Sequence, residues 1–363
     1  MRKREVRVRA VLAFVAAASL AVGDASAQET ERIDHYIAAH PGITLFVREV
    51  RPVGSAQRTL PALVLLHGAR VPSVPSFDLA VPGYSLAADL ASAGFAVYLL
   101  DARGYGGSTR PPEMSEPPDA HPPLVRSNEV VRDIDVVVNW IEEHEGVTTV
   151  SLLGWATGGH WAGYYASLFP EKVSHLVFFN TLYGGTNQHD GIGPGSSLED
   201  PDVPGRFNAA YGSYRLSTAA SLFGAWDASI PLEQKEAWRD PRVSDAYADA
   251  ALASDATSRS RTPASFRSPS GAMEDSYYLA SGRRLWDASL ITASTLILRS
   301  EADFWSRPED VMMLQEHLTR AASVYALTIP GATHFVHLDR PERGRARLLD
   351  EVVRFLTTAE LHD

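Results

Sequence analysis

The chain is expected to turn sharply at residues 152–159, which read LLGWATGG. The apolar, β-branched run Thr148–Leu153 predicts a buried strand, and the pattern Gly158–Leu168 predicts a helix. Between them, glycines flank Ala156 on both sides in a Gly-x-Ala-x-Gly turn. Flanking glycines let a strand and a helix pack closely around a strained central residue. A sharp strand–turn–helix of this kind is therefore predicted.

The same alternation of apolar strand and helix continues along the chain. The predicted strands are Ile43–Val50, Ala62–Leu66, Phe95–Leu100, Thr148–Leu153, His175–Asn180, Thr295–Ser300 and Ser323–Ile329. The predicted helices are Ser85–Ala93, Ser127–His144, Gly158–Leu168, Pro308–Ala321 and Arg343–Thr358. Nearly continuous apolar strands that alternate with helices predict an α/β fold with a mostly parallel central sheet covered by helices on both faces.

The alternation breaks at residues 182–291, where Gly, Pro and Ser cluster. Helical patterns occur near Ser213–Trp226, Leu232–Trp238, Val243–Ala256 and Ala272–Trp286, and no convincing buried strand appears. We interpret 182–291 as a helical cap inserted after strand 6, between core segments 28–181 and 292–363. The alternative is an ordinary run of surface helices.

Composition and the N-terminus narrow the class of protein. Hydrophobic residues make up 45% of the chain and cysteine is absent, which excludes a disulfide scaffold and a cysteine-ligated metal or iron–sulfur site. A net charge of −11 argues against nucleic-acid binding and against docking on anionic lipid.

Residues 1–27 combine a basic start, an apolar run and a small-residue end, which predicts a signal peptide cleaved after Ala27 and a secreted or periplasmic protein. An uncleaved membrane anchor is the alternative.

Two late loops carry an acid and a base. Asp303 follows the strand Thr295–Ser300, and His334 follows the strand Ser323–Ile329. A carboxylate that accepts a hydrogen bond from one imidazole nitrogen leaves the other nitrogen free to act as a base. Glu301 and His337 are the rival acid and base. No metal-binding motif occurs, because the twelve histidines are scattered, and we expect neither a metal nor a cofactor.

Backbone amides at the same sheet edge are candidates for an oxyanion hole. Ala69 follows a buried strand that ends in His-Gly, and Thr157 comes directly after Ala156 and before a predicted helix, so the N–H groups of both residues are candidates. The candidates for substrate binding are Arg70, Trp155, Tyr183 and Trp226. Arg70 could meet either a substrate carboxylate or a surface acid.

Together these features resemble the α/β-hydrolase superfamily. The matching residues are His67-Gly68, Asp101-x-Arg103-Gly104-x-Gly106-x-Ser108, the Gly154-x-Ala156-x-Gly158 elbow, Asp303, His334-Phe335 and the downstream run 339–342. The order elbow, acid, histidine is that of the family. The resemblance implies an acyl-enzyme mechanism. A nucleophile at position 156 attacks a carbonyl, His334 moves the proton, Asp303 orients His334, and the amides of Ala69 and Thr157 stabilise the oxyanion.

Ala156 departs from that pattern, because its methyl group cannot attack a carbonyl. The residue that the elbow lacks is interpreted as Ser, since the branches of the family that use Asp usually have Pro where Arg70 stands. Three interpretations remain open: an engineered Ser→Ala change, a natural pseudoenzyme that only binds a ligand, and a rearranged site that uses Thr157 or a water molecule.

Three functions follow as hypotheses. The first is an exported serine hydrolase that cleaves a small or medium-sized, partly apolar ester or lactone. The second is an amidase or an aminopeptidase resembling proline iminopeptidases, which would need acidic cap residues such as Glu199–Asp202 or Glu274-Asp275 around a substrate amine. The third is a non-catalytic binding protein. Each would act on or bind a small molecule.

Overall fold

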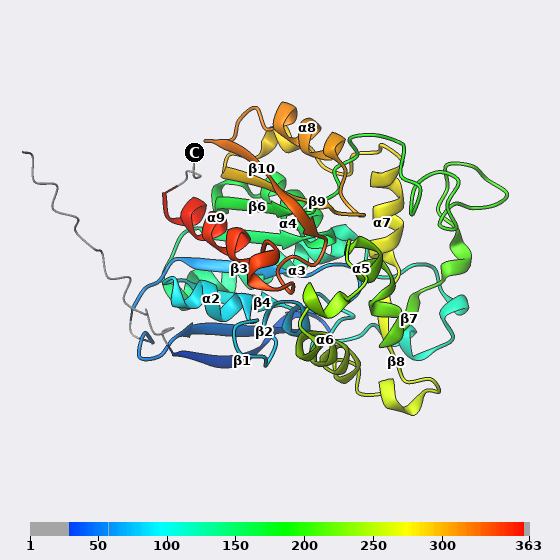
Figure 1. The fold of residues 1–363 in the computed structure, drawn as a ribbon, viewed down its shortest axis with the longest axis horizontal. Coiled ribbons are helices and arrows are strands. Elements are labelled where there is room, and N and C mark those ends of the chain that lie inside the picture. The colour runs from blue at the N-terminus through cyan, green and yellow to red at the C-terminus, as the bar shows by residue number, and fades with distance from the viewer. Residues whose placement is uncertain (1–28, 57, 359–363) are drawn as a thin grey trace, which may run out of the picture.

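The central feature of the computed structural model is an eight-stranded sheet (Figure 1), within a structure that describes residues 29–56 and 58–358. The predicted signal peptide lies outside the described residues. The sheet has the order β1-β2-β4-β3-β5-β6-β9-β10. Its strands are β1 Thr30–His40, β2 Ile43–Pro52, β3 Ala62–Leu66, β4 Ala96–Leu100, β5 Val150–Trp155, β6 Val173–Phe179, β9 Ser294–Ala302 and β10 Val324–Thr333. Strand β2 runs antiparallel to both neighbours, and the other adjacent pairs are parallel.

Two layers of helices cover the sheet. The helices are α1 Ser73–Phe77, α2 Leu86–Ser92, α3 Ser127–Glu145, α4 Thr157–Leu168, α5 Gly224–Ser229, α6 Pro241–Ala253, α7 Gly271–Ala280, α8 Pro308–His317 and α9 Arg345–Thr358. Alternate residues of β3 enter different cores: Val64 packs with α3, α4 and α8, whereas Leu63 and Leu65 pack with α2 and α9. Because both faces of the central strands are buried, those strands consist of apolar residues throughout.

The predicted α/β class is confirmed, and each predicted strand begins and ends within four residues of an observed one. Strand β1 was missed. It lies at the edge of the sheet, and its sequence, TERIDHYIAAH, has mostly exposed or half-buried side chains, so it has no apolar run.

The segment between β6 and β9 contains α5, α6 and α7 together with a second, two-stranded sheet. Its strands are β7 Tyr214–Thr218 and β8 Ser265–Pro269, which pair antiparallel. The predicted helix over Ser213–Trp226 is therefore wrong at its start. The side chains of β7 are mostly half-buried, so the strand lacks the apolar run that marks a core strand. In Figure 1 this segment gathers at one end of the strands. Its role as a cap and the domain boundaries stay predictions.

Among residues 29–56 and 58–358, the helices are too short or too polar for any of them to cross a membrane.

Candidate active site

The turn after β5 holds Ala156 in a strained backbone conformation. Its φ and ψ are 53° and −116°, a region that residues with a side chain rarely adopt. The glycines around it are required by close packing. A Cβ added to Gly158 would lie 2.0 Å from the carbonyl oxygen of Leu66, and one added to Gly154 would lie 2.3 Å from that of Gly158. The strand and the helix can therefore meet around Ala156 only with glycine at these positions.

Asp303 and His334 come together at the same edge of the sheet. His334 Nδ1 lies 2.6 Å from Asp303 Oδ1, and both side chains are almost completely buried. Asp303 follows β9, and His334 follows β10, so parallel neighbouring strands bring the two loops side by side. An imidazole whose Nδ1 is held by a carboxylate leaves Nε2 as the nitrogen that can take a proton.

The carboxylate of Asp303 is held by its own loop as well as by His334. The backbone N–H groups of Trp305 and Ser306 donate to it at 3.1 and 2.8 Å, and the hydroxyl of Ser306 donates to it too. Burial alone would raise the pKa of Asp303, but the attraction of His334 and these hydrogen bonds hold it below its usual value. The group is therefore a fixed anion at neutral pH.

Two side chains anchor the backbone of His334. Trp155 Nε1 and Asn180 Nδ2 donate to its carbonyl oxygen at 3.1 and 3.2 Å. Asn180 also accepts from the backbone N–H of Ser300 at 2.7 Å, so it ties β6 to β9 and to the histidine loop. We did not single out Asn180 from the sequence. An asparagine directly after a buried strand, with a φ of 52°, is the signal that could have identified it.

A pocket of about 150 Å³ opens over the elbow. Ala156, Thr157, Ala69 and His334 all contribute to its wall. Thr157 is the first residue of α4, so its N–H has no partner within the helix. The remaining lining residues come from the loop after β3, from the β6–β9 segment and from the loops that carry Asp303 and His334: Gly68, Arg70, Val71, Trp155, Arg215, Leu222, Ala225, Tyr247, Met273, Phe304, Trp305 and Phe335.

Of the four candidates for substrate binding, Arg70 and Trp155 line this pocket, whereas Tyr183 and Trp226 do not. Tyr183 is fully buried against Trp286, and its hydroxyl accepts from the backbone N–H of Ala288 at 3.0 Å. Its assignment to the substrate is therefore corrected to packing. Arg215, Tyr247 and Phe304 line the pocket but were not among the four candidates. For Arg215 and Tyr247, nothing in a single sequence tells which side chains of the segment between β6 and β9 face inward.

Trp226 lies behind the pocket wall rather than on it. Its ring stacks on Phe335 with centroids 4.5 Å apart, and its Nε1 donates to Asp339 Oδ1 at 2.9 Å. Trp238 and Thr333 donate to the other oxygen of Asp339. Trp226 is thus corrected from a substrate contact to a support for Phe335, which does line the pocket.

Asp339 gives a prediction for the pH dependence of stability. Burial raises its pKa to about 7 despite these three donors, so the folded protein keeps a proton that the unfolded chain loses near pH 4. The contribution of the bound proton of Asp339 to the free energy of unfolding is complete below about pH 4 and is lost as the pH rises through about 7. We expect the free energy of unfolding of the unaltered chain, relative to Asp339→Asn, to fall by up to about 1.4 kcal/mol per pH unit between pH 5 and 7.

Urea denaturation at pH 5, 6 and 7 would measure this difference. Asp350→Asn changes an exposed carboxylate and is the control, for which we expect no trend. A pH-independent difference between the unaltered chain and Asp339→Asn would contradict the prediction.

Neither rival residue reaches the pocket wall. Glu301 is exposed and accepts from the backbone N–H of Gly331 at 2.6 Å, so it joins the two loops instead of orienting His334. His337 is fully buried against the ring of Trp155, with centroids 4.5 Å apart, and burial lowers its pKa well below the usual value. His337 is a neutral residue of the core.

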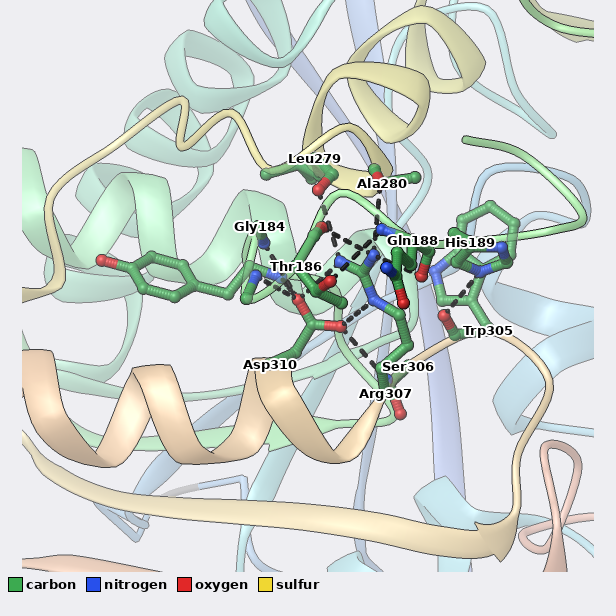
Figure 2. A network of polar contacts seen from close by, with 12 residues as sticks. Gly184, Thr186, Gln188, His189, Leu279, Ala280, Trp305, Ser306, Arg307 and Asp310 are labelled. Atoms are coloured by element: carbon green, nitrogen blue, oxygen red, sulfur yellow. Dashed lines mark hydrogen bonds and ion pairs between the residues drawn. The ribbon is translucent and has the colours of Figure 1, made fainter. Parts of the chain in front are cut away.

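A buried ion pair holds the loop after Asp303 against the start of the insert (Figure 2). Asp310 Oδ1 accepts from the backbone N–H groups of residues 183–185, each at 2.9 Å. Arg307 Nε donates to Asp310 Oδ2 at 2.8 Å, and the same guanidinium donates to the carbonyl oxygens of Thr186 and Ala280. The segment that leaves β6, the end of α7 and the start of α8 are thereby joined at one point.

We expect Asp310→Ala to lower the free energy of unfolding by about 3–5 kcal/mol, because it leaves a buried guanidinium and three backbone N–H groups without their acceptor. Denaturation in urea measures the change. Glu309→Ala alters an exposed carboxylate in the same helix and is expected to change stability by less than about 0.5 kcal/mol. A loss below about 1 kcal/mol for Asp310→Ala would contradict this account.

Within the described part of the chain, one group of residues has the chemistry of a metal site. Ligand atoms of His35, Glu49 and His144 lie within 4.8 Å of one another, where β1 and β2 meet the end of α3. Glu49 is already paired with His35 at 2.8 Å and with Arg51 at 2.6 Å. None of these residues lines the pocket over Ala156.

Comparison with known proteins agrees with this architecture. The family model described as "alpha/beta hydrolase fold" matches residues 61–341. Solved structures that resemble the chain include E-2-(acetamidomethylene)succinate hydrolase, with 19% identity and a TM-score of 0.57, over 90% of this chain and all of that one. An esterase from Exiguobacterium antarcticum has 16% identity and a TM-score of 0.54, with the same coverage. At these identities the likeness concerns the fold.

The curated relatives match shorter stretches. The (lyso)-N-acylphosphatidylethanolamine lipase of Mus musculus is 31% identical over 125 residues, which are 34% of this chain and 31% of the lipase. The poly(3-hydroxyalkanoate) polymerase subunit PhaC of Haloferax mediterranei is 34% identical over 95 residues, which are 26% of this chain and 17% of the subunit. The chain thus spans less than a third of the length of these relatives.

Proposed function

Since the chain belongs to the α/β-hydrolase fold family, we propose that it carries the site of an exported carboxylic ester or lactone hydrolase in which Ala156 stands in place of a serine nucleophile. The observation that carries the proposal is that His334, which is paired with Asp303, lines the same pocket as the strained elbow at Ala156. The names of some similar proteins, an esterase and a lipase, support a hydrolase of this general kind.

In this proposal, a serine hydroxyl at position 156 attacks the ester carbonyl while His334 Nε2 takes its proton. The N–H groups of Ala69 and Thr157 stabilise the oxyanion, and His334 then protonates the departing alcohol. Water activated by His334 releases the acyl group. The chain with Ala156 has the groups that bind and polarise the ester, but it lacks the hydroxyl that forms the acyl-enzyme.

The pocket argues against the aminopeptidase hypothesis. A substrate amine would need a carboxylate, and no residue that lines the pocket in the described part of the chain is acidic. Asp200 and Asp275, from the two acidic runs considered for that role, pair with Arg206 and Arg126.

Thr157 is a poor substitute for the missing nucleophile. Its hydroxyl is fully buried, and in the described structure it has no hydrogen-bond partner that could activate it. If a slow hydrolysis by the unaltered chain disappeared in Thr157→Val, the rearranged site would be the correct interpretation.

The experiment that tests the proposal is Ala156→Ser, assayed with p-nitrophenyl esters and aminoacyl anilides. We expect hydrolysis of the esters. Activity on the anilides alone would favour an amidase, and activity on neither, with ligand binding retained, would favour a non-catalytic binding protein.

A further inference from the structure

Two arginines converge on the pocket without an acidic partner. Arg70 follows β3, Arg215 lies on β7, and both line the pocket beside Ala156. Over the residues that the structure describes, the pocket wall includes no aspartate or glutamate. The whole chain has 44 acidic residues and 33 basic ones. The described pocket wall, with two arginines and no carboxylate, therefore has the opposite charge to the chain as a whole.

The hydrogen bonds of Arg70 all go to neutral groups. Its Nε donates to Ser217 Oγ at 3.0 Å, and its two terminal nitrogens donate to the carbonyl oxygen and to the hydroxyl of Ser221 at 2.9 and 2.8 Å. These contacts fix the position of the guanidinium, but none of them neutralises its charge.

Arg215 is less well satisfied. One terminal nitrogen donates to the carbonyl oxygen of Ala69 at 2.9 Å, and Nε is buried with no partner among the described residues. Buried polar groups in proteins are normally hydrogen-bonded, so an unpaired N–H of a guanidinium calls for a physical reason.

The two guanidinium groups also act on each other. Burial, together with the nearby charge of Arg70, lowers the pKa of Arg215 to about 10. Burial lowers the pKa of Arg70 as well. Two neighbouring, half-buried cations without a counter-ion are unfavourable, and an anion placed between them would reduce that cost and supply the missing acceptor.

We propose that Arg70 and Arg215 form an anion subsite and that the ligand of this pocket is an ester or lactone bearing a carboxylate. The ester or lactone part rests on the proposed function, whereas the binding of the carboxylate does not. Arg215 is bonded to Ala69, whose N–H is a candidate oxyanion donor, so the carboxylate would lie near the reacting carbonyl group. The apolar walls formed by Leu222, Ala225 and Met273 suit the carbon chain of such a ligand.

The test compares ligands that differ only in charge. The unaltered chain is titrated by calorimetry at pH 7.5 with the monomethyl esters of malonate, succinate and glutarate, and with the corresponding neutral ester-amides, in which a carboxamide replaces the carboxylate. We expect at least one half-ester to bind tenfold or more tightly than its amide, as is typical of a charge-assisted hydrogen bond. Equal affinity for charged and neutral ligands throughout would overturn the proposal.

Variants then assign the preference to the arginines. Arg215→Met should lose it, while Arg215→Lys, which keeps the charge, should keep part of it. Arg110→Gln is the matched control, since Arg110 also bonds to neutral carbonyl oxygens and has a buried, unpartnered Nε in the described structure, but lies outside the pocket. A preference that survives Arg215→Met, with the fold verified by circular dichroism, would overturn the proposal.

The two proposals can fail separately. If the carboxylates bind but Ala156→Ser hydrolyses no ester, the anion subsite stands and the hydrolase does not. If Ala156→Ser hydrolyses the half-esters and the neutral ester-amides equally well and neither binds preferentially, the hydrolase stands and the anion subsite does not.

Discussion

An Ala156→Ser variant is expected to hydrolyse p-nitrophenyl acetate or butyrate about a millionfold faster than the unaltered chain, the factor by which a serine hydrolase falls when its nucleophile is removed. The reason is that the rest of the site is already present. The backbone at position 156 is held in the strained turn, and His334, which is paired with Asp303, lines the same pocket. In the proposed mechanism, only the attacking oxygen is missing.

The matched control for this variant is Ala225→Ser. It makes the same substitution in the wall of the same pocket, away from the elbow, so it should leave the rate at the level of the unaltered chain. Initial rates and an acyl-enzyme mass increment, trapped with a slowly hydrolysed ester, would measure the gain. An Ala156→Ser protein that folds and binds esters but is no faster than Ala225→Ser would contradict the serine interpretation of the elbow.

Burial on both faces decided which strands could be predicted. The strands β3, β4 and β5 are buried along their whole length. The first two are uninterrupted apolar runs between turn residues, and β5 is mainly apolar. The edge strand β1 and the ribbon strand β7 are partly exposed, and their mixed sequences resemble loops or helices. The central strands could thus be predicted, whereas of the two edge strands β10 was predicted and β1 was not.

The same reasoning applies to the candidate site. Ala156, Asp303 and His334 each follow the carboxyl end of a parallel strand, so predicting the strands also brings these residues to one edge. Arg215 and Trp226 lie in the segment between β6 and β9, where the direction of a side chain depends on how short elements pack. Their roles became apparent only from three-dimensional contacts.

The second large effect is expected from His334→Ala in the Ala156→Ser background, which should lower kcat by about ten-thousandfold while leaving ester binding nearly unchanged. In the proposed mechanism, the imidazole is the base for both the attack and the release of the acyl group. It contacts the pocket from a loop whose backbone is fixed by Trp155 and Asn180, so its removal should leave the pocket's shape intact. Retention of more than about a tenth of kcat would exclude His334 as the base.

The partner of the base can be tested in the same background. Asp303→Asn should also lower kcat strongly, because the amide can no longer hold the imidazole in the tautomer that presents Nε2 as an acceptor or stabilise the imidazolium ion. Glu301→Gln changes an exposed side chain two residues away that bonds to Gly331 instead, so it should have little effect. If Glu301→Gln caused the greater loss, the acid would have been wrongly assigned. The 2.6 Å contact between Asp303 and His334 would then only hold the two loops together.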